Sequence, residues 1–216
     1  MIQAVLFDLD RTLLDRDQSL KNFVKKQYDS FQSLHQYIER DEFLERFIEL
    51  DEGGYQPKEQ VYKQLVARYY MDTINDQKLL DHYYNFFSEE CIGFKGMCEM
   101  LIILQKKGIK LGIITNGQTN FQTANIRALD IEDFLDVILI SEQEQMKKPD
   151  RRIFQKAAEQ LQVPIESCLF VDDHVKNDVE GALAAGMKAI WKRGPDDNCR
   201  KEVLSIVELE EVIDFL

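Results

Sequence analysis

Short apolar runs alternate with helix-like segments through the second half of the chain, and this alternation limits the fold more than any other feature. Four runs have the length of buried strands: residues 110–115, 134–140, 168–171 and 189–192. Apolar residues recur at helical spacing in the segments 97–107, 118–128, 150–162 and 177–185. The run 2–7 is apolar throughout, as central strands of parallel sheets are. The pattern predicts an α/β fold with a doubly wound parallel sheet.

The segment from residue 16 to residue 91 differs from the rest of the chain. Four sets of apolar residues, rich in Tyr and Phe, recur there at helical spacing, and no strand pattern is present. We therefore predict two domains. Residues 1–15 and 92–216 form the α/β core, and residues 16–91 form a bundle of four helices inserted after the first strand of the core.

The charge of the chain narrows the classes of partner. The 216 residues carry a formal net charge of −12, so a nucleic acid polymer, whose phosphates would be repelled, is not expected to bind. A small anionic substrate is compatible with this charge, because a metal and a few cations can reverse the potential inside one cleft.

The expected location follows from three sequence features. No run approaches the roughly 20 apolar residues of a membrane span, so no membrane partner is predicted. The first residues lack the apolar run of a signal peptide. The four cysteines form neither a CxxC pair nor a zinc pattern, and scattered thiols are typical of a reducing compartment. The prediction is a cytoplasmic protein.

Polar residues follow three of the predicted strands at the points where the strands end. They are Asp8, Asp10 and Thr12 after the first strand, Thr115 and Asn116 at the end of strand 110–115, and Asp172 and Asp173 after strand 168–171. Ligands of open α/β sheets bind outside the carboxyl ends of the strands. Three strands that deliver polar groups to one edge therefore predict a binding site there.

Carboxylates dominate this edge of the predicted sheet. Asp8 and Asp10 are two residues apart, so in an extended chain their side chains point the same way. Converging carboxylates repel one another unless a cation lies between them or one holds a proton. A third carboxylate from Asp173 completes a set of hard oxygen ligands, which suits Mg²⁺ with open positions for water and a substrate phosphate.

Four motifs occur in order along the chain: FDLDRT (residues 7–12), ITNG (114–117), KKPDRRIF (147–154) and VDDHVKND (171–178). Together they resemble the four motifs of the haloacid dehalogenase superfamily, the first of which reads DxDxT. One such motif is a weak signal, whereas four in the family's order across nearly the whole chain are specific. The resemblance implies a Rossmann-like core and, from the position of the insert, the phosphatase branch with a helical C1-type cap.

The resemblance also implies a role for each matched residue. Asp8 would be the nucleophile that forms an aspartyl-phosphate, and Asp10 the general acid and base. Thr115 and Lys148 would bind the phosphoryl oxygens. Mg²⁺ would be held by Asp8, by the backbone carbonyl of Asp10 and by Asp173. The implied enzyme is a magnesium-dependent phosphoric monoester hydrolase acting on a small phosphorylated metabolite, a nucleoside monophosphate or a sugar phosphate.

Further residues of the motifs are expected around this centre. Phosphate contacts are predicted for Thr12, Asn116 and Gly117, and support of the metal-binding residues is predicted for Asp172, Asn177 and Asp178.

Three positions depart from the superfamily's usual residues. Asp172 replaces a glycine, which leaves open whether Asp172 or Asp173 contacts the metal, although the spacing to the following Asn-Asp pair favours Asp173. For Arg11 and His174, a solvated or structural role is favoured over contact with the substrate or with metal-bound water.

The insert is expected to act as a lid over small substrates. Gly53, Gly54 and Tyr55 are expected to form a turn between two of its helices, where caps of this superfamily often contact substrate, and a plain turn without substrate contact is slightly favoured.

Three other functions share part of the pattern. A dehalogenase would use the same nucleophile, but that branch lacks the acid at the position of Asp10. A β-phosphoglucomutase-like phosphotransferase would share all four motifs. A signalling protein that keeps its aspartyl-phosphate without turnover would be shorter and would lack the insert. The sequence does not determine the oligomeric state.

Overall fold

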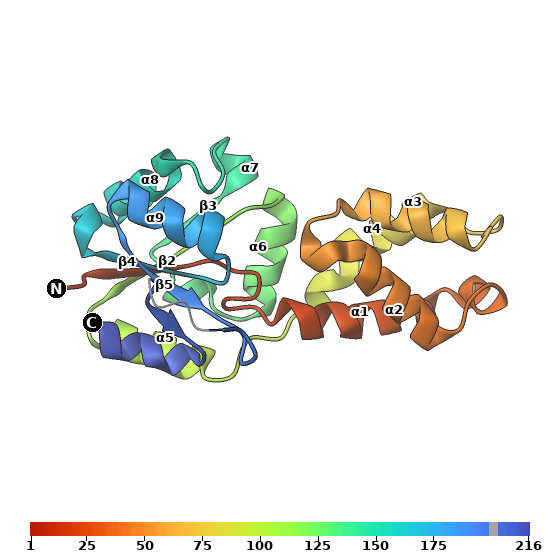
Figure 1. The fold of residues 1–216 in the computed structure, drawn as a ribbon, viewed down its shortest axis with the longest axis horizontal. Helices are drawn as coiled ribbons and strands as arrows, with labels where there is room; N and C mark the ends of the chain where they lie inside the picture. Colours follow the sequence, from red (N-terminus) through yellow and green to blue (C-terminus); the bar gives the residue numbers. More distant parts are fainter. Residues whose placement is uncertain (199–202) are drawn as a thin grey trace. The chain divides into compact units, whose positions relative to one another are not determined.

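The computed structural model describes residues 1–198 and 203–216, and for Asn177 it describes the backbone alone. The chain divides into two compact units (Figure 1). The core unit consists of Met1–Asp15 and Gly93–Leu216, and the helical unit is Arg16–Ile92. Cys91, Cys98 and Cys168 are free thiols, and Cys199 lies outside the described residues. Every helix of the described part is too short or too polar to cross a membrane.

A parallel sheet forms the centre of the core unit (Figure 1). Within the described residues it has six strands, β1 (Ala4–Phe7), β2 (Lys110–Thr115), β3 (Val137–Ile140), β4 (Cys168–Asp172), β5 (Lys188–Lys192) and β6 (Ser205–Ile206), in the order β3-β2-β1-β4-β5-β6. Each neighbouring pair is parallel. The chain builds the sheet outward from β1 in one direction and then in the other, which confirms the predicted doubly wound α/β fold.

The position of β1 explains both its sequence and its importance. All four of its residues are fully buried, which is why the strand is apolar on both faces. Phe7 is in register with Ile113 of β2 and with Val171 of β4. The carboxyl ends of these three strands therefore lie side by side, and the residues that follow them are brought to one edge of the sheet.

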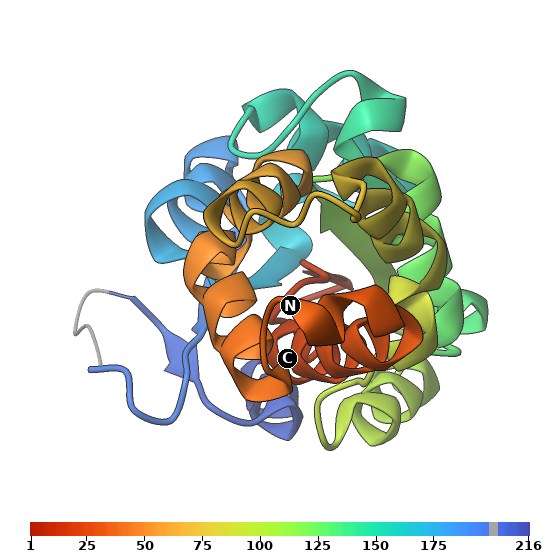
Figure 2. The ribbon, with the colours of Figure 1, turned by 90° about the vertical axis from the view of Figure 1, so that its right-hand side faces the viewer.

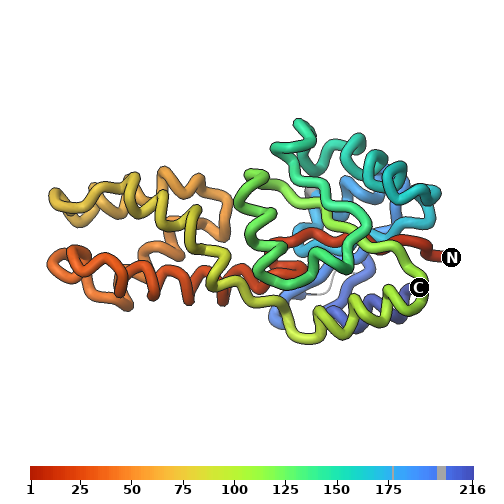
Figure 3. The backbone as a smooth tube through the Cα atoms, turned by 180° about the vertical axis from the view of Figure 1, so that it is seen from behind, coloured from red at the N-terminus to blue at the C-terminus, as the bar shows by residue number. Residues whose placement is uncertain are grey.

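Helices cover both faces of the sheet. On one face lie α8 (Arg151–Leu161) and α9 (Glu180–Ala185), and on the other lies α5 (Met97–Lys106) with the 3-10 helix η7 (Leu209–Phe215) beside it (Figures 1 and 2). The helix α6 (Thr119–Ala128) follows β2, and the short α7 (Ser141–Glu144) follows β3. The two chain termini lie near each other in this unit (Figure 3).

The helical unit contains four α-helices within its described residues: α1 (Arg16–Ser30), α2 (Arg40–Asp51), α3 (Lys58–Arg68) and α4 (Asp76–Phe86). Short 3-10 helices lie between and after them at Gln32–Gln36, Glu52–Gly54 and Phe87–Glu90. Fully buried aromatic side chains fill its interior: Phe23, Phe43, Phe47, Tyr62 and Phe87. This aromatic core is the reason for the helical spacing of Tyr and Phe in the sequence.

Several elements differ from their predicted bounds. The strand expected at 134–140 begins only at Val137, because a 3-10 helix occupies Glu132–Phe134 and the side chain of Asp136 accepts a hydrogen bond from the Leu111 backbone N–H over 2.8 Å. The helix expected at 177–185 consists of a π-helical turn, Val175–Val179, followed by α9. The short strand β6 was not predicted, since two residues carry no readable alternation.

Candidate active site

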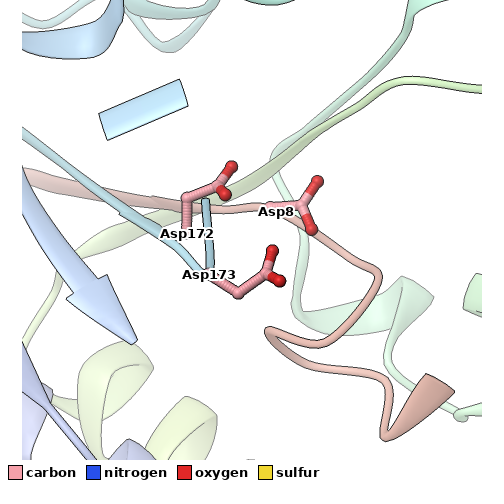
Figure 4. Close-up of side chains that lie close together, drawn as sticks. All are labelled: Asp8, Asp172 and Asp173. Atoms are coloured by element: carbon pink, nitrogen blue, oxygen red, sulfur yellow. The ribbon is translucent and has the colours of Figure 1, made fainter. Parts of the chain in front are cut away.

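Three carboxylates meet where β1 and β4 end. Asp8 follows β1, and its backbone N–H donates to the Val171 carbonyl oxygen over 2.9 Å, which fixes the chain beside β4. Asp172 is the last residue of β4, and Asp173 follows it. Each acid offers an oxygen, and these oxygens all lie within 4.8 Å of one another. Figure 4 shows the three side chains at this edge of the sheet.

Lys148 lies among these acids. Its Nζ donates to Asp8 Oδ1 over 2.6 Å and to Asp172 Oδ2 over 2.7 Å, and Asp178 Oδ2 lies 3.9 Å away. The lysine side chain is only 2% exposed. Charge-assisted hydrogen bonds shielded from water are strong, so Lys148 fixes the orientation of Asp8 and offsets part of the negative charge.

Burial and the surplus of acids over cations together set the direction of the pKa shifts at this site. Burial raises the pKa of Asp8 well above its usual range; the Lys148 ammonium opposes this shift, and the neighbouring carboxylates add to it. Burial and the charge of Asp172 raise the pKa of Asp173 to about 7. Burial disfavours the Lys148 ammonium, but the surrounding carboxylates raise its pKa above the ordinary value. Ionising every acid here leaves a surplus negative charge that a cation would stabilise.

The donor set fits a small divalent cation, because carboxylate oxygens are the ligands that Mg²⁺ prefers. Asp172 has both oxygens engaged: Oδ2 accepts from Lys148, and Oδ1 accepts from the His174 backbone N–H over 2.8 Å. Asp8 and Asp173 are therefore the better candidates for metal ligands, and Asp172 acts as an anchor for Lys148. A metal contact from the backbone carbonyl of Asp10 stays a prediction.

Asp10 and Thr115 share one hydrogen-bonding partner. The Nε2 atom of Gln122 donates to Asp10 Oδ2 over 2.9 Å and to Thr115 Oγ1 over 2.8 Å. Gln122 belongs to α6 and is buried, as is Thr115. The predicted acid and base and the predicted phosphate ligand are thus held by the same amide, although they follow different strands.

Asn116 joins the loop after β2 to the loop that carries Lys148. Its Nδ2 donates to the Lys148 carbonyl oxygen over 3.1 Å, and its Oδ1 accepts from the Lys148 backbone N–H over 2.9 Å. The backbone N–H of Gly117 donates to Ser141 Oγ over 2.9 Å. The side chain of Asn116 therefore positions Lys148, and phosphate contacts from Asn116 and Gly117 stay predictions.

The turn after Asp10 is fixed by a buried lysine that sequence analysis did not single out. Arg11 has a left-handed φ of 61°, and its carbonyl oxygen accepts from Lys192 Nζ over 3.3 Å. The same Nζ lies 3.4 Å from the centre of the Phe94 ring, and burial lowers the pKa of Lys192. Thr12 is fully buried, and its Oγ1 has no hydrogen-bond partner among the described residues. Contact between this hydroxyl and a phosphate stays a prediction.

The residues around Asp173 complete the site. Its carbonyl oxygen accepts from Trp191 Nε1 over 2.9 Å, and the positive charge of Arg11 favours its ionised form. Asp178 lies in the π-helical turn, and its buried Oδ1 has no hydrogen-bond partner within the described part of the chain. Burial raises the pKa of Asp178, and the Lys148 ammonium opposes this shift. The predicted supporting role of Asn177 falls on a side chain outside the described residues.

The three residues predicted to confer specificity lie in the helical unit. Gly53 and Gly54 belong to the 3-10 helix after α2, and Tyr55 is 70% exposed. A Cβ on Gly54 would lie 3.1 Å from the guanidinium carbon of Arg16, so this glycine permits a close approach to the arginine. Contact with a substrate stays a prediction for all three.

Comparison with known proteins identifies the family. The model of the haloacid dehalogenase-like hydrolases matches residues 5–192. The chain belongs to this family. A glyceraldehyde 3-phosphate phosphatase of Pyrococcus abyssi is 29% identical over 201 residues, which cover 88% of this chain and 81% of that protein. A pyrimidine 5'-nucleotidase of Escherichia coli is 31% identical over 120 residues, which cover 55% of this chain and 53% of that protein.

A solved structure agrees with these similarities. The crystal structure of a HAD phosphatase from Thermococcus onnurineus has a TM-score of 0.72 and 26% identity, covering 99% of this chain and 97% of that one. The predicted superfamily is confirmed, and so is the predicted class of enzyme, a phosphoric monoester hydrolase of this family. The C1-type cap stays a prediction.

Sequence analysis missed Gln122, Asn125 and Lys192. All three are buried polar residues, and they lie on segments that were predicted to be an amphipathic helix or an apolar strand. The available signal was a polar residue among the apolar positions of the helix predicted at 118–128. The helical spacing of those apolar positions could have shown that Gln122 lies on the buried face.

Proposed function

We propose that this protein is a magnesium-dependent phosphatase that hydrolyses a small phosphomonoester through an aspartyl-phosphate at Asp8. The observation that carries the proposal is the 2.6 Å contact between Lys148 Nζ and Asp8 Oδ1 inside a cluster of carboxylates. An anionic nucleophile must approach an anionic phosphate, and a buried ammonium beside it reduces the repulsion.

The first step transfers the phosphoryl group to the enzyme. A carboxylate oxygen of Asp8 attacks phosphorus, and the bond from phosphorus to the substrate oxygen breaks. Asp10 gives its proton to that leaving oxygen, so the alcohol departs neutral. The Thr115 hydroxyl and the Lys148 ammonium bind the phosphoryl oxygens, over which negative charge spreads during transfer.

The second step returns the enzyme to its starting state. Asp10, now ionised, removes a proton from a water molecule, and the resulting hydroxide attacks the phosphorus of the aspartyl-phosphate. The bond between phosphorus and the Asp8 oxygen breaks, which releases inorganic phosphate. Because its pKa is raised, Lys148 stays protonated through both steps.

A magnesium ion held by Asp8, by Asp173 and by the carbonyl of Asp10 would stabilise the charge on the phosphoryl oxygens. The close carboxylates and the raised pKa values of Asp8 and Asp173 support this assignment, since a divalent cation removes the mutual repulsion that produces those shifts.

The substrate that we infer is a small phosphorylated metabolite, a sugar phosphate or a nucleoside monophosphate. The similarity to a glyceraldehyde 3-phosphate phosphatase spans 88% of the chain, whereas the similarity to a pyrimidine nucleotidase spans 55%. The longer match favours sugar phosphates. The helical unit begins at Arg16, shortly after Asp8 in the chain, and we infer that it is the cap that excludes water during the reaction. A cytoplasmic location is part of the proposal and rests on the free thiols.

The decisive experiment is a screen of phosphorylated metabolites for released inorganic phosphate, with Mg²⁺ and with EDTA. The expected result is Mg²⁺-dependent turnover of at least one sugar phosphate or nucleoside monophosphate, lost in EDTA and restored by excess Mg²⁺. Chromatography of the same reactions measures isomer formation. Isomer without released phosphate would replace the phosphatase with a phosphotransferase. A phosphoenzyme that persists without turnover would contradict catalysis.

A further inference from the structure

Gln122 is a buried amide that contacts two residues of the proposed mechanism without being part of any motif. We propose that Gln122 is a positioning residue that holds the Asp10 carboxylate and the Thr115 hydroxyl in the geometry in which they act on the substrate. The inference rests on the proposed function, because it takes Asp10 as the general acid and base and Thr115 as a phosphate ligand.

The contacts of the amide are specific. Its Nε2 lies 2.9 Å from Asp10 Oδ2, 2.8 Å from Thr115 Oγ1 and 3.3 Å from the Asn116 carbonyl oxygen. An amide nitrogen carries two hydrogens, which match the two shorter contacts. Gln122 is 2% exposed, so the surrounding protein leaves little room for water to replace either bond.

A neighbouring residue fixes which end of the amide faces the site. Asn125 is fully buried, and its Nδ2 donates to Gln122 Oε1 over 3.1 Å. With Oε1 held in this way, Nε2 must point toward Asp10. The reversed amide would bring an oxygen against the ionised Asp10 carboxylate and would break the bond from Asn125.

Gly117 provides the space for this arrangement. A Cβ at that position would lie 2.9 Å from Gln122 Cγ, closer than side chains approach one another. The glycine of the ITNG motif therefore lets the Gln122 side chain pass close to the backbone of the loop after β2. This observation is independent of the hydrogen bonds and shows that a larger residue at position 117 would displace the Gln122 side chain.

The arrangement has a consequence for each partner. A hydroxyl has a single hydrogen, so when Thr115 Oγ1 accepts from Gln122 its own O–H is directed elsewhere, as a phosphate ligand requires. The bond to Asp10 Oδ2 restricts rotation of the carboxylate, and proton transfer depends steeply on such geometry. Gln122 thus acts through two groups rather than by touching the substrate.

The test begins with Gln122→Leu, which keeps the bulk of the side chain and removes both donated bonds. The expected result is a loss of about 10²-fold in kcat, with KM changing by less than about threefold, since displacing a reacting group slows the chemical step more than binding. The matched control is Asn120→Leu, an exposed position of the same helix, which should leave both constants unchanged. A Gln122→Leu enzyme with normal kcat would overturn the proposal.

Two further variants separate positioning from packing. Gln122→Glu keeps the volume and the acceptor for Asn125 but turns a donor into an acceptor, so it should be at least as slow as Gln122→Leu at neutral pH. A fast Gln122→Glu enzyme would contradict the proposal. The double variant with Asp10→Asn should be less than about tenfold slower than Asp10→Asn alone, because one of the two groups on which Gln122 acts is already gone and only the effect through Thr115 is left. Full multiplication of the two single effects would show that Gln122 acts independently of Asp10 and would overturn the positioning of Asp10.

Crystal structures of the unaltered protein and of Gln122→Leu distinguish failure of this inference from failure of the proposed function. The inference expects the Asp10 carboxylate or the Thr115 side chain to change orientation in the variant, whether or not any phosphate ester is hydrolysed. Unchanged side chains overturn it. Changed side chains in a protein without phosphatase activity would sustain the positioning role and refute the proposed reaction.

Discussion

The two units of this protein each bury a cluster of charged side chains, and the ratio of acids to cations differs between the two clusters. In the core unit, Lys148 is bonded to the carboxylates of Asp8 and Asp172. In the helical unit, Asp51 lies between two cations: its oxygens accept from the Arg16 guanidinium over 3.1 and 3.2 Å, and it also pairs with Lys58. In the first cluster several acids surround one cation, and in the second one acid lies between two cations.

The pKa shifts follow from this difference. Burial, together with the neighbouring carboxylates, raises the pKa of Asp8 and of Asp173, and the Lys148 ammonium does not offset this effect. Burial also opposes ionisation of Asp51, but Arg16 and Lys58 outweigh it and lower the pKa of Asp51. The comparison teaches that an acid buried between two cations is held in its ionised form by the protein's own charges. An acid cluster left without compensation is suited to a ligand of opposite charge.

The largest expected effect comes from removing the proposed nucleophile. Asp8→Asn should lower kcat by about 10⁴-fold or more, because the variant lacks the carboxylate that is proposed to form the aspartyl-phosphate. The thermal midpoint should not fall, since the ionised form of Asp8 is disfavoured by its surroundings. Phosphate release from the best substrate of the screen and a thermal melt measure both outcomes.

The control for this variant is Asp133→Asn, which changes an exposed aspartate of the core unit and should alter neither quantity. Appreciable turnover by Asp8→Asn would remove the covalent mechanism.

The helical unit should respond in the opposite way to an equivalent substitution. Asp51→Asn removes the carboxylate that the buried Arg16 and Lys58 both contact and should lower the free energy of unfolding by roughly 3–5 kcal/mol. Urea unfolding followed by circular dichroism measures the change.

Asp29→Asn is the matched control, because Asp29 pairs with Arg40 where both side chains are about half exposed, and little change is expected there. If both substitutions lower the free energy of unfolding by the same amount, then burial does not make the Asp51 ion pairs more important than the exposed Asp29 pair.

The smallest expected effect is a pH dependence that differs in sign between the units. The pKa of Asp173 is about 7 in the folded protein and roughly 3.9 when unfolded, so between those pH values the folded state holds a proton that the unfolded state has lost. Asp173 therefore lowers stability as the pH rises through this window when no metal is bound. The pKa of Asp51 is lowered, so Asp51 stabilises the folded state at pH values above the ordinary carboxyl pKa. This stabilisation is lost as the pH falls below that value.

Unfolding in EDTA across this pH range, with and without Asp173→Asn, measures the effect. The variant should flatten the downward slope. At roughly 100 times Kd, Mg²⁺ should stabilise the unaltered protein by about 2.7 kcal/mol at pH 8, and the same Mg²⁺ concentration should stabilise it less at pH 5. An equal effect of Mg²⁺ at both pH values would mean that these carboxylates are not its ligands.

The sequence predicted those parts of the site in which a polar residue directly follows an apolar strand. The apolar run before Asp8 and the run before Asp172 indicated buried strands, and the rule that ligands bind at strand ends placed their acids at one edge. Lys148 was identified as a site residue from the Pro-Asp pair that follows it in its motif, and hydrophobic periodicity did not indicate it. The bounds of β3 and the π-helical turn after His174 were not predicted, because both depend on contacts with other segments.

What the sequence determined by itself was the alternation of elements and the spacing of motif residues, since hydrophobic periodicity and turn chemistry are local properties. Tertiary structure alone decided that Asp172 anchors Lys148 and that Gln122 contacts both Asp10 and Thr115. Parallel pairing of β1 with β2 and β4 joins segments more than a hundred residues apart, and the direction of a buried amide on α6 is set by what those segments bring to it. A hydrogen bond between distant segments requires both partners to be in place. A sequence pattern describes one segment and does not show which residue of another segment lies beside it.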